Sequence, residues 1–282
     1  MAGVTYKPPA VAAYFDEFGE AEWERYDRSA LGAVHEHIHN YYLERFVAAG
    51  SHVLEIGAGP GRFTQTLHRL GCGIVVGDLS DVQLALNRKF GAERGFASSV
   101  EAYLKVDICD LAGVDSQSFD VVVAYGGPLS YVFERRDDAV VSCRRVLRPG
   151  GLLLASVMSL WGTLHRHLAA LRDYPLANVA SFVASGDLTS ENDPTSPHHC
   201  HMYQSQELVA LLKRHGFTIE ALAASNALST NLEPLLLELR QMDDRWQALL
   251  DLERQATAQP GYVDGGTHLI VAARAPGSPP RH

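Results

Sequence analysis

Cysteine is scarce in this chain of 282 residues, which contains four, and no two of them form a C-x-x-C pair. A disulfide framework or a structural zinc site needs closely spaced cysteines, so the sequence predicts neither. Scattered thiols of this kind are typical of a reduced, cytoplasmic protein. The four positions are Cys72, Cys109, Cys143 and Cys200.

Runs of positive charge and long apolar runs are missing as well. The formal net charge is −9, and no run of Lys and Arg exceeds two residues, so a nucleic-acid partner is not expected. The longest apolar run, Leu152 to Leu160, is interrupted by serines and is too short to span a bilayer. The first residues contain no apolar signal-peptide segment. We therefore expect a soluble cytoplasmic protein without a membrane partner.

The middle of the chain alternates between short apolar strands and helices. Such alternation favours a parallel sheet that is covered by helices on both faces. The predicted strands are 52–56, 74–77, 102–106, 120–124 and 151–157, with helices at 62–70, 81–94 and 134–147. Helical patterns also cover 11–46, 204–214 and 232–257, the last as one long helix. Two further strands are expected, one that follows residues 215–217 and ends at 223 and one at 267–273.

A glycine-rich turn follows the first predicted strand. Residues 55–61 read Glu-Ile-Gly-Ala-Gly-Pro-Gly and lead into a helix. A dinucleotide fingerprint needs Gly where Arg62 stands, and a P-loop needs Lys followed by Ser or Thr where Arg62 and Phe63 stand. A tight turn without any ligand is the structural alternative. The pattern that remains resembles the first motif of the class I S-adenosylmethionine (SAM) methyltransferases.

This resemblance implies an α/β, Rossmann-like fold. We expect a seven-stranded, mostly parallel sheet whose last strand is antiparallel, with helices on both faces. The chain would divide into an N-terminal helical lid (1–48), a SAM-binding domain (49–275) and a flexible tail (276–282). Helical cap insertions are expected at about 158–204 and 226–262.

The resemblance also implies a SAM site at the ends of the predicted strands. Asp78 would accept hydrogen bonds from the ribose hydroxyls, and Asp107, with Asp110 as a competitor, would bind the adenine amino group. Glu55 would lie near the ammonium group of the methionine end. Arg62 would reach its carboxylate or lie exposed on its helix. The expected cofactor-binding residues are Tyr14, Glu55, Gly57, Ala58, Gly59, Gly61, Asp78, Leu79, Asp107, Ile108, Tyr125 and Gly126.

Residues after the fourth predicted strand bear on the methyl acceptor. Gly126-Gly127-Pro128 replaces the Asp/Asn-Pro-Pro-Tyr sequence of many methyltransferases that act on amide or exocyclic nitrogen. It resembles instead the bacterial small-molecule methyltransferases of types 11 and 25. We therefore expect a small-molecule acceptor, with O-methylation ahead of N-methylation and further ahead of C-methylation. A SAM-binding regulatory protein without turnover is the alternative.

Histidine supplies the expected general base, because a hydroxyl acceptor must lose a proton. His201 and His199 are the predicted catalytic residues, with His198, His165 and His167 as further candidates. Another histidine group, at positions 35, 37 and 39, lies within a predicted helix. We interpret it as part of a solvated or capped helix rather than a metal site, and we expect no metal. The predicted helix 232–257 could form a homodimer face.

Overall fold

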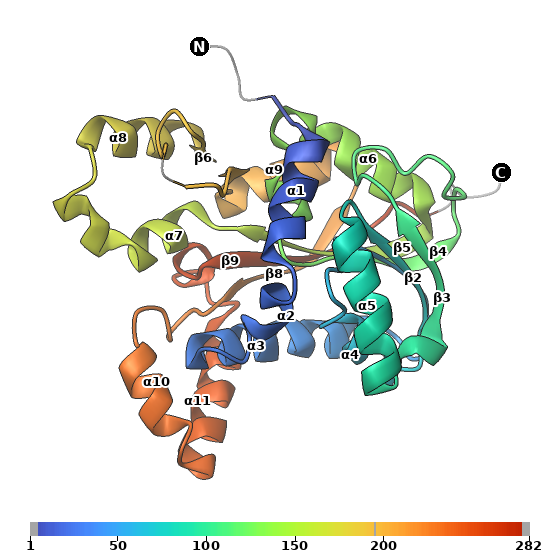
Figure 1. Ribbon diagram of the computed structural model, residues 1–282, viewed down its shortest axis with the longest axis horizontal. Coiled ribbons are helices and arrows are strands. Elements are labelled where there is room, and N and C mark those ends of the chain that lie inside the picture. The colour runs from blue at the N-terminus through green and yellow to red at the C-terminus, as the bar shows by residue number, and fades with distance from the viewer. Residues whose placement is uncertain (1–4, 195, 278–282) are drawn as a thin grey trace.

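A seven-stranded sheet forms the centre of the protein. The computed structural model describes residues 5–194 and 196–277, and its strands lie in the order β3-β2-β1-β4-β5-β9-β8 (Figure 1). All neighbouring pairs are parallel except those of β9, which runs antiparallel to β5 and β8. The predicted fold class is confirmed. The strands are β1 His52–Ile56, β2 Gly73–Asp78, β3 Val100–Lys105, β4 Phe119–Ala124, β5 Leu147–Met158, β8 Thr218–Ser225 and β9 His268–Arg274.

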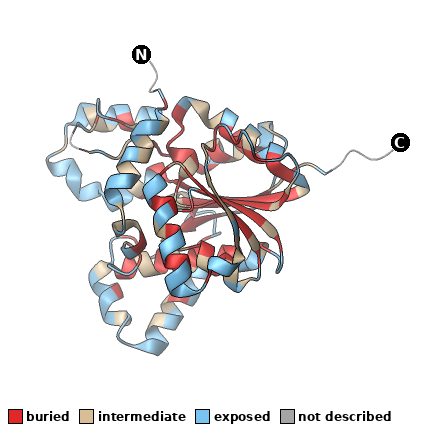
Figure 2. Cartoon of the chain, turned by 45° about the vertical axis from the view of Figure 1, so that its right-hand side comes forward, coloured by how far each residue is buried: buried red, intermediate tan, exposed pale blue. Residues whose placement is uncertain are grey.

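Helices cover both faces of the sheet because the strands are apolar on both sides. Successive strand residues face opposite layers: Leu54 packs into one buried cluster and Val53 into the other. The first layer contains α6 (Arg136–Val146) and α9 (Ser205–Arg214). The second contains α3 (Ala30–Phe46), α4 (Thr64–Arg69) and α5 (Asp81–Arg94). Figure 2 shows the buried sheet between these layers.

The N-terminal segment lies over the edge of the sheet where the parallel strands end. It contains α1 (Pro8–Phe18) and α2 (Ala21–Glu24), and Figure 1 shows α1 crossing in front of the sheet near α5. The hydroxyl of Ser80 donates to Asp16, and the side-chain amide of Gln83 donates to the carbonyl oxygen of Phe15 at 2.8 Å. Residues 1–4 of the predicted lid lie outside the described residues.

A helical segment leaves the end of β5 and forms the lobe at the upper left of Figure 1. It comprises α7 (Leu160–Arg166) and α8 (Leu176–Ser185), followed by the short antiparallel pair β6 (Asp187–Leu188) and β7 (Cys200–His201). The 3-10 helices of the described chain are η1 Ala97–Ser99, η2 Pro128–Ser130, η3 Phe133–Arg135, η4 Leu168–Arg172 and η5 Val263–Gly265.

The predicted helix 232–257 is wrong as a single element. It is two helices, α10 (Glu233–Leu239) and α11 (Asp243–Ala256). Asp243 and Asp244 lie in the first turn of α11, where acidic side chains favour a helix start. Both helices pack against α3 through residues such as Leu236 and Leu250. This second predicted cap therefore lies beside α3.

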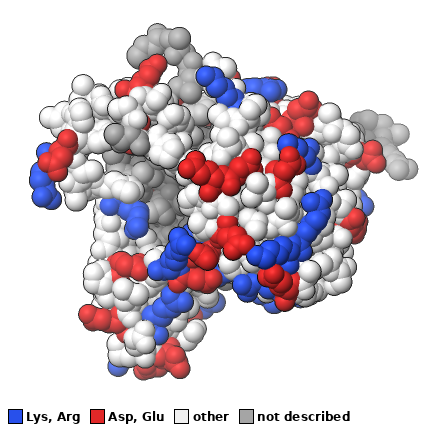
Figure 3. Space-filling model, in the orientation of Figure 1, with Lys and Arg blue, Asp and Glu red and all other residues white. Residues whose placement is uncertain are grey.

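The charges on the face seen in Figure 3 are mixed in sign, with Lys and Arg next to Asp and Glu. Within residues 5–194 and 196–277, no helix combines the length and the apolar character that a bilayer crossing requires. Of the predicted tail, residues 278–282 lie outside the described chain.

Candidate active site

The glycine loop between β1 and α4 has a backbone shape that glycine permits. Gly57, Gly59 and Gly61 all have positive φ, at 65°, 54° and 101°. A Cβ on Gly61 would lie 2.8 Å from Cζ of Phe96, so Gly61 also has a packing reason. A Cβ on Gly59 would instead meet Cγ of Glu22, at 3.6 Å, in the N-terminal segment. The loop thus faces that segment at Gly59.

Asp78 connects this loop to the end of β2. Its Oδ2 accepts a hydrogen bond from the N–H of Gly59 at 2.9 Å, and its Oδ1 accepts one from the N–H of Ser80 at 2.9 Å. Burial raises the pKa of Asp78, and these backbone hydrogen bonds oppose the rise. The carboxylate is therefore held at the strand end that the sequence predicted for it.

The next strand end contains Asp107. Its Oδ1 accepts hydrogen bonds from the hydroxyl of Tyr6 at 3.0 Å and from the N–H of Cys109 at 2.8 Å. Asp110, the competing acid, accepts from the N–H of Ala112 within its own turn. Ile108 is buried, and Leu79, after Asp78, is half-buried. The N-terminal segment thus also contacts this second strand end.

Glu55 is buried and has a partner within the protein. Its Oε2 accepts a hydrogen bond from the hydroxyl of Thr64 at 2.6 Å, and it is 2% exposed. Burial raises its pKa to about 8, so the carboxyl group is uncharged near neutral pH. Its predicted place near the ammonium group stays a prediction. Arg62 follows neither expectation: it is paired with Asp27 and Glu36 at 2.6 Å each.

The end of β4 contributes Tyr125 and Gly126. Tyr125 is 3% exposed, and its hydroxyl is buried without a hydrogen-bond partner among the described residues. The N–H of Gly126 donates to the hydroxyl of Ser156 on β5 at 3.0 Å, and a Cβ on Gly126 would lie 3.6 Å from Nη2 of Arg25. The second loop at the sheet edge thus also faces the N-terminal segment.

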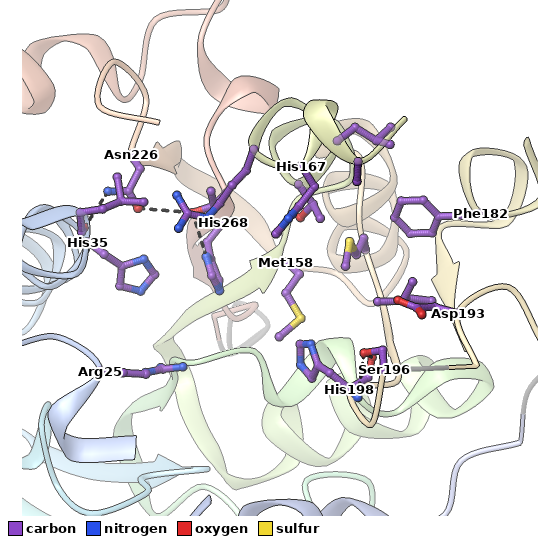
Figure 4. A pocket seen from close by; sticks show the side chains of 18 of the residues that line it. Arg25, His35, Met158, His167, Phe182, Asp193, Ser196, His198, Asn226 and His268 are labelled. Atoms are coloured by element: carbon purple, nitrogen blue, oxygen red, sulfur yellow. Dashed lines mark hydrogen bonds between the residues drawn. The ribbon is translucent and has the colours of Figure 1, made fainter. Parts of the chain in front are cut away.

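A cavity of about 680 Å³ lies next to these loops, and we call it the large cavity. Its wall combines α1, α2 and α3 with the end of β5, the lobe of α7 and α8, and the start of β9. Figure 4 shows Met158 between Arg25, His35 and His268 on one side and Phe182 on the other. Its aromatic and histidine lining includes Tyr14, Phe15, Phe18, Tyr26, His35, Tyr131, His167, Tyr174, Phe182, His198 and His268. Of residues 226–262, it includes Asn226 alone.

Three histidines are packed together beside this cavity. The rings of His35 and His39 stack at 4.1 Å, and His35 meets His268 edge to face at 4.7 Å. Burial lowers the pKa of all three, that of His39 to about 3, so they are neutral at neutral pH. Of the predicted solvated or capped helix, a cap is present in the side chain of Ser29, whereas solvation is wrong for His35 and His39, which are 8% exposed and fully buried, respectively. Their i, i+4 spacing was the signal for one shared face.

The pairing of strand ends explains why His268 reaches the cavity. Met158, His268 and Ser225 are register partners at the ends of β5, β9 and β8. Because β9 is antiparallel, its first residue lies at the edge where the parallel strands end. His268 is not among the residues predicted from the sequence, although the predicted antiparallel last strand places its first residue at this edge.

The predicted catalytic histidines lie outside the wall of the large cavity. Nδ1 of His201 is 2.7 Å from Asp187, and its Nε2 is 2.9 Å from Glu207. Burial and the nearby Arg136 lower the pKa of His201, but these two carboxylates raise it further than that, and both ring nitrogens are engaged. His199 borders a second cavity of about 340 Å³, which shares Tyr14 and Tyr131 with the large cavity.

His198 does line the large cavity. Its Nε2 is 2.7 Å from the hydroxyl of Tyr131, and its ring stacks on Tyr14 at 5.5 Å. Burial lowers its pKa to about 4. Of the other candidates, His167 lines the same cavity, whereas His165 is not part of its wall. Within the described part of the chain, no cluster of three or more potential metal ligands is arranged around a common point.

Two charged residues that no sequence pattern identified border both the loops and the cavity. Glu22 and Arg25 form an ion pair at 3.0 Å, and both line the large cavity. No motif marks them, because α2 is a single turn and its place beside the glycine loop depends on how the N-terminal segment folds back.

Comparison with known proteins agrees with this geometry. Residues 54–155 match a family described as "Methyltransferase domain". The ubiquinone biosynthesis O-methyltransferase of Hahella chejuensis is 32% identical over 116 residues, 41% of this chain and 47% of that protein. The demethylmenaquinone methyltransferase of Clavibacter sepedonicus is 30% identical over 157 residues, 54% of this chain and 60% of that protein. The chain thus matches about half the length of these relatives.

A solved structure shares the fold. The SAM-dependent methyltransferase from Mesorhizobium loti superposes with a TM-score of 0.53 at 18% identity, covering 83% of this chain and 96% of that one. At this identity the likeness concerns the fold alone.

Proposed function

We propose, from the chain's membership of the class I SAM-dependent methyltransferases, that it transfers the methyl group of SAM to a hydroxyl group of a small molecule held in the large cavity. The observation that carries the proposal is the position of that cavity. It adjoins the sheet edge at Met158 and His268, next to the loops that would hold the cofactor. In open parallel sheets, ligands bind at this edge.

The residues at the edge fit SAM. The carboxylate of Asp78 would hold the ribose, and Asp107 the adenine amino group. The glycine loop allows close approach of the cofactor, and the methionine end would lie between Gly59 and Gly126. When bound, SAM supplies a methyl group on a positively charged sulfur. The protein's part is then to hold the acceptor in line and to exclude water.

The acceptor is best described as uncharged and largely apolar. The charged side chains of the cavity wall are two acidic and two basic ones, so their formal charges cancel: Glu22, Asp193, Arg25 and Arg166. His35, His198 and His268 are neutral because burial lowers their pKa values. A buried unpaired charge on the acceptor would lack compensation. An aromatic molecule with a hydroxyl group suits the aromatic lining. The O-methyltransferase named above supports O-methylation.

Deprotonation of that hydroxyl would be the task of a neutral histidine. His268 is our candidate, since it stands at the strand ends nearest the cofactor edge. Its Nδ1 lies 3.3 Å from the hydroxyl of Thr267, so Nε2 is the nitrogen that would take the proton. His199 and His201, the residues predicted from the sequence, stay alternatives that the substitutions below separate.

Two measurements test the proposal. Calorimetry should show that the folded protein binds S-adenosylhomocysteine, and incubation with SAM and a panel of phenols, amines and carboxylic acids should release S-adenosylhomocysteine with phenols. Binding without turnover of any acceptor would favour the regulatory alternative. Preferred turnover of amines would replace O- by N-methylation. The homodimer and the cytoplasmic location stay predictions.

A further inference from the structure

The N-terminal segment carries two similar ion pairs in different surroundings. Glu24 and Arg28 pair in solvent, with 49% and 64% of their side chains exposed. Glu22 and Arg25 pair at 3.0 Å, with 12% and 35% exposed. The second pair faces the two loops of the sheet edge. A Cβ placed on Gly59 would lie 3.6 Å from Cγ of Glu22, and one placed on Gly126 would lie 3.6 Å from Nη2 of Arg25.

This inner pair does not satisfy its own polar atoms. Oε2 of Glu22 and Nε of Arg25 are buried, and neither has a hydrogen-bond partner among the described residues. Leaving a buried polar atom unpaired is costly, so such atoms in a folded protein call for an explanation. A ligand with one group of each charge would provide both missing partners.

The other charged groups near the glycine loop are already satisfied. Arg62 is held by Asp27 and Glu36, and the uncharged carboxyl of Glu55 accepts from Thr64. Asp78 accepts from two backbone N–H groups. Glu22 and Arg25 differ from these groups: each has a buried polar atom without a partner among the described residues, and they lie against the loops of Gly59 and Gly126.

We propose that Glu22 and Arg25 bind the aminocarboxyl end of SAM, the guanidinium group pairing with the carboxylate and the carboxylate pairing with the ammonium group. This inference rests on the proposed function, because it assumes that SAM occupies the sheet edge. The ligand's two charges are joined through a single carbon atom, and the i, i+3 pair presents the complementary charges side by side.

The arrangement has a consequence for the order of binding. Because Glu22 and Arg25 also line the large cavity, their contacts with the cofactor would fix part of the acceptor's wall. Together with the contacts of Tyr6 to Asp107 and of Asp16 to Ser80, these would close the N-terminal segment over SAM. We therefore expect SAM to bind before the acceptor.

The test compares two ligands that differ in the aminocarboxyl end. S-adenosylhomocysteine has this end and 5′-methylthioadenosine lacks it, and calorimetry measures the affinity of each. Arg25→Gln and Glu22→Gln should weaken S-adenosylhomocysteine at least tenfold and change the affinity for methylthioadenosine less than twofold. Arg25→Lys should retain part of the affinity. The outer pair provides matched controls, Arg28→Gln and Glu24→Gln, which should change neither affinity.

Equal weakening of both ligands would assign the pair a structural role, and unchanged binding of both would remove it from the cofactor site; either result overturns the inference. Thermal unfolding of each variant checks that it is folded, and Glu22→Gln decides the question should Arg25→Gln fail to fold. The expected ligand difference in a protein that turns over no acceptor would refute the proposed function and support this inference. A wild-type protein that binds neither ligand would refute both.

Discussion

The cofactor edge and the large cavity are built in different ways, although they adjoin. Asp78, Asp107 and the glycine loop belong to strand ends that follow one another along the chain, and backbone N–H groups fix the two carboxylates. The cavity wall is assembled from α1 to α3, α7, α8 and the start of β9. Local geometry therefore defines the first region, and long-range packing defines the second. The two should respond differently to substitution.

The largest expected effect is at Asp78. Asp78→Asn removes the charge that would hold the ribose and weakens the acceptors for two backbone N–H groups. We expect S-adenosylhomocysteine to bind at least a hundredfold more weakly, about 3 kcal/mol. Calorimetry measures this affinity. Asp110→Asn, in the turn after β3, serves as the control. An unchanged affinity for Asp78→Asn would remove the ribose assignment and, with it, the distinction between the two regions.

A substitution of His268, in the wall of the large cavity, should lower turnover and leave cofactor affinity unchanged. His268→Gln should lower kcat by about 100-fold, the lower end of what a general base contributes. The affinity for S-adenosylhomocysteine should stay within twofold. His201→Gln should leave kcat near the wild-type value and lower thermal stability, because it breaks the contacts to Asp187 and Glu207. The reverse pattern would restore His201 as the base.

Glu55 joins the two ends of the glycine loop through its hydrogen bond with Thr64. Its carboxyl group should make the stability of the fold depend on pH. Its pKa of about 8 exceeds that of an unfolded Glu, so the folded state binds the extra proton between about pH 4.5 and pH 8. Stability therefore falls as pH rises through this window. The stability of Glu55→Gln relative to the wild type should therefore rise by about 3 to 4 kcal/mol between pH 5 and pH 8, measured by denaturant unfolding. A constant difference would show that the carboxyl group is ionised in the fold.

The smallest effect is expected in the pH profile of kcat/KM. Burial lowers the pKa of His268, and the neighbouring His39, Arg25 and His198 oppose its protonation further; His35 packs on its ring. The basic form is then already present at pH 6, so the profile should stay flat between pH 6 and pH 8. An inflection near pH 6.5 would mean that the catalytic base is a histidine with an ordinary pKa.

The sequence determined the features that depend on neighbouring residues. Strand periodicity predicted the sheet, and the glycine loop with Asp78 predicted a cofactor edge, because a strand end and the turn after it are local structure. Long-range packing decided the rest. Arg62 pairs with Asp27 and Glu36, which lie 35 and 26 residues away in the sequence. The start of β9 brought His268 to Met158 across more than 100 residues of chain.

The N-terminal segment shows the same limit. Glu22 and Arg25 lie in a single helical turn without a sequence motif, and they reach Gly59 and Gly126 because the chain folds back over the sheet edge. A buried atom's partners depend on segments distant in sequence, and no local pattern records them. The sequence alone therefore determined the fold and the kind of cofactor, whereas the tertiary structure decided which side chains face the ligands.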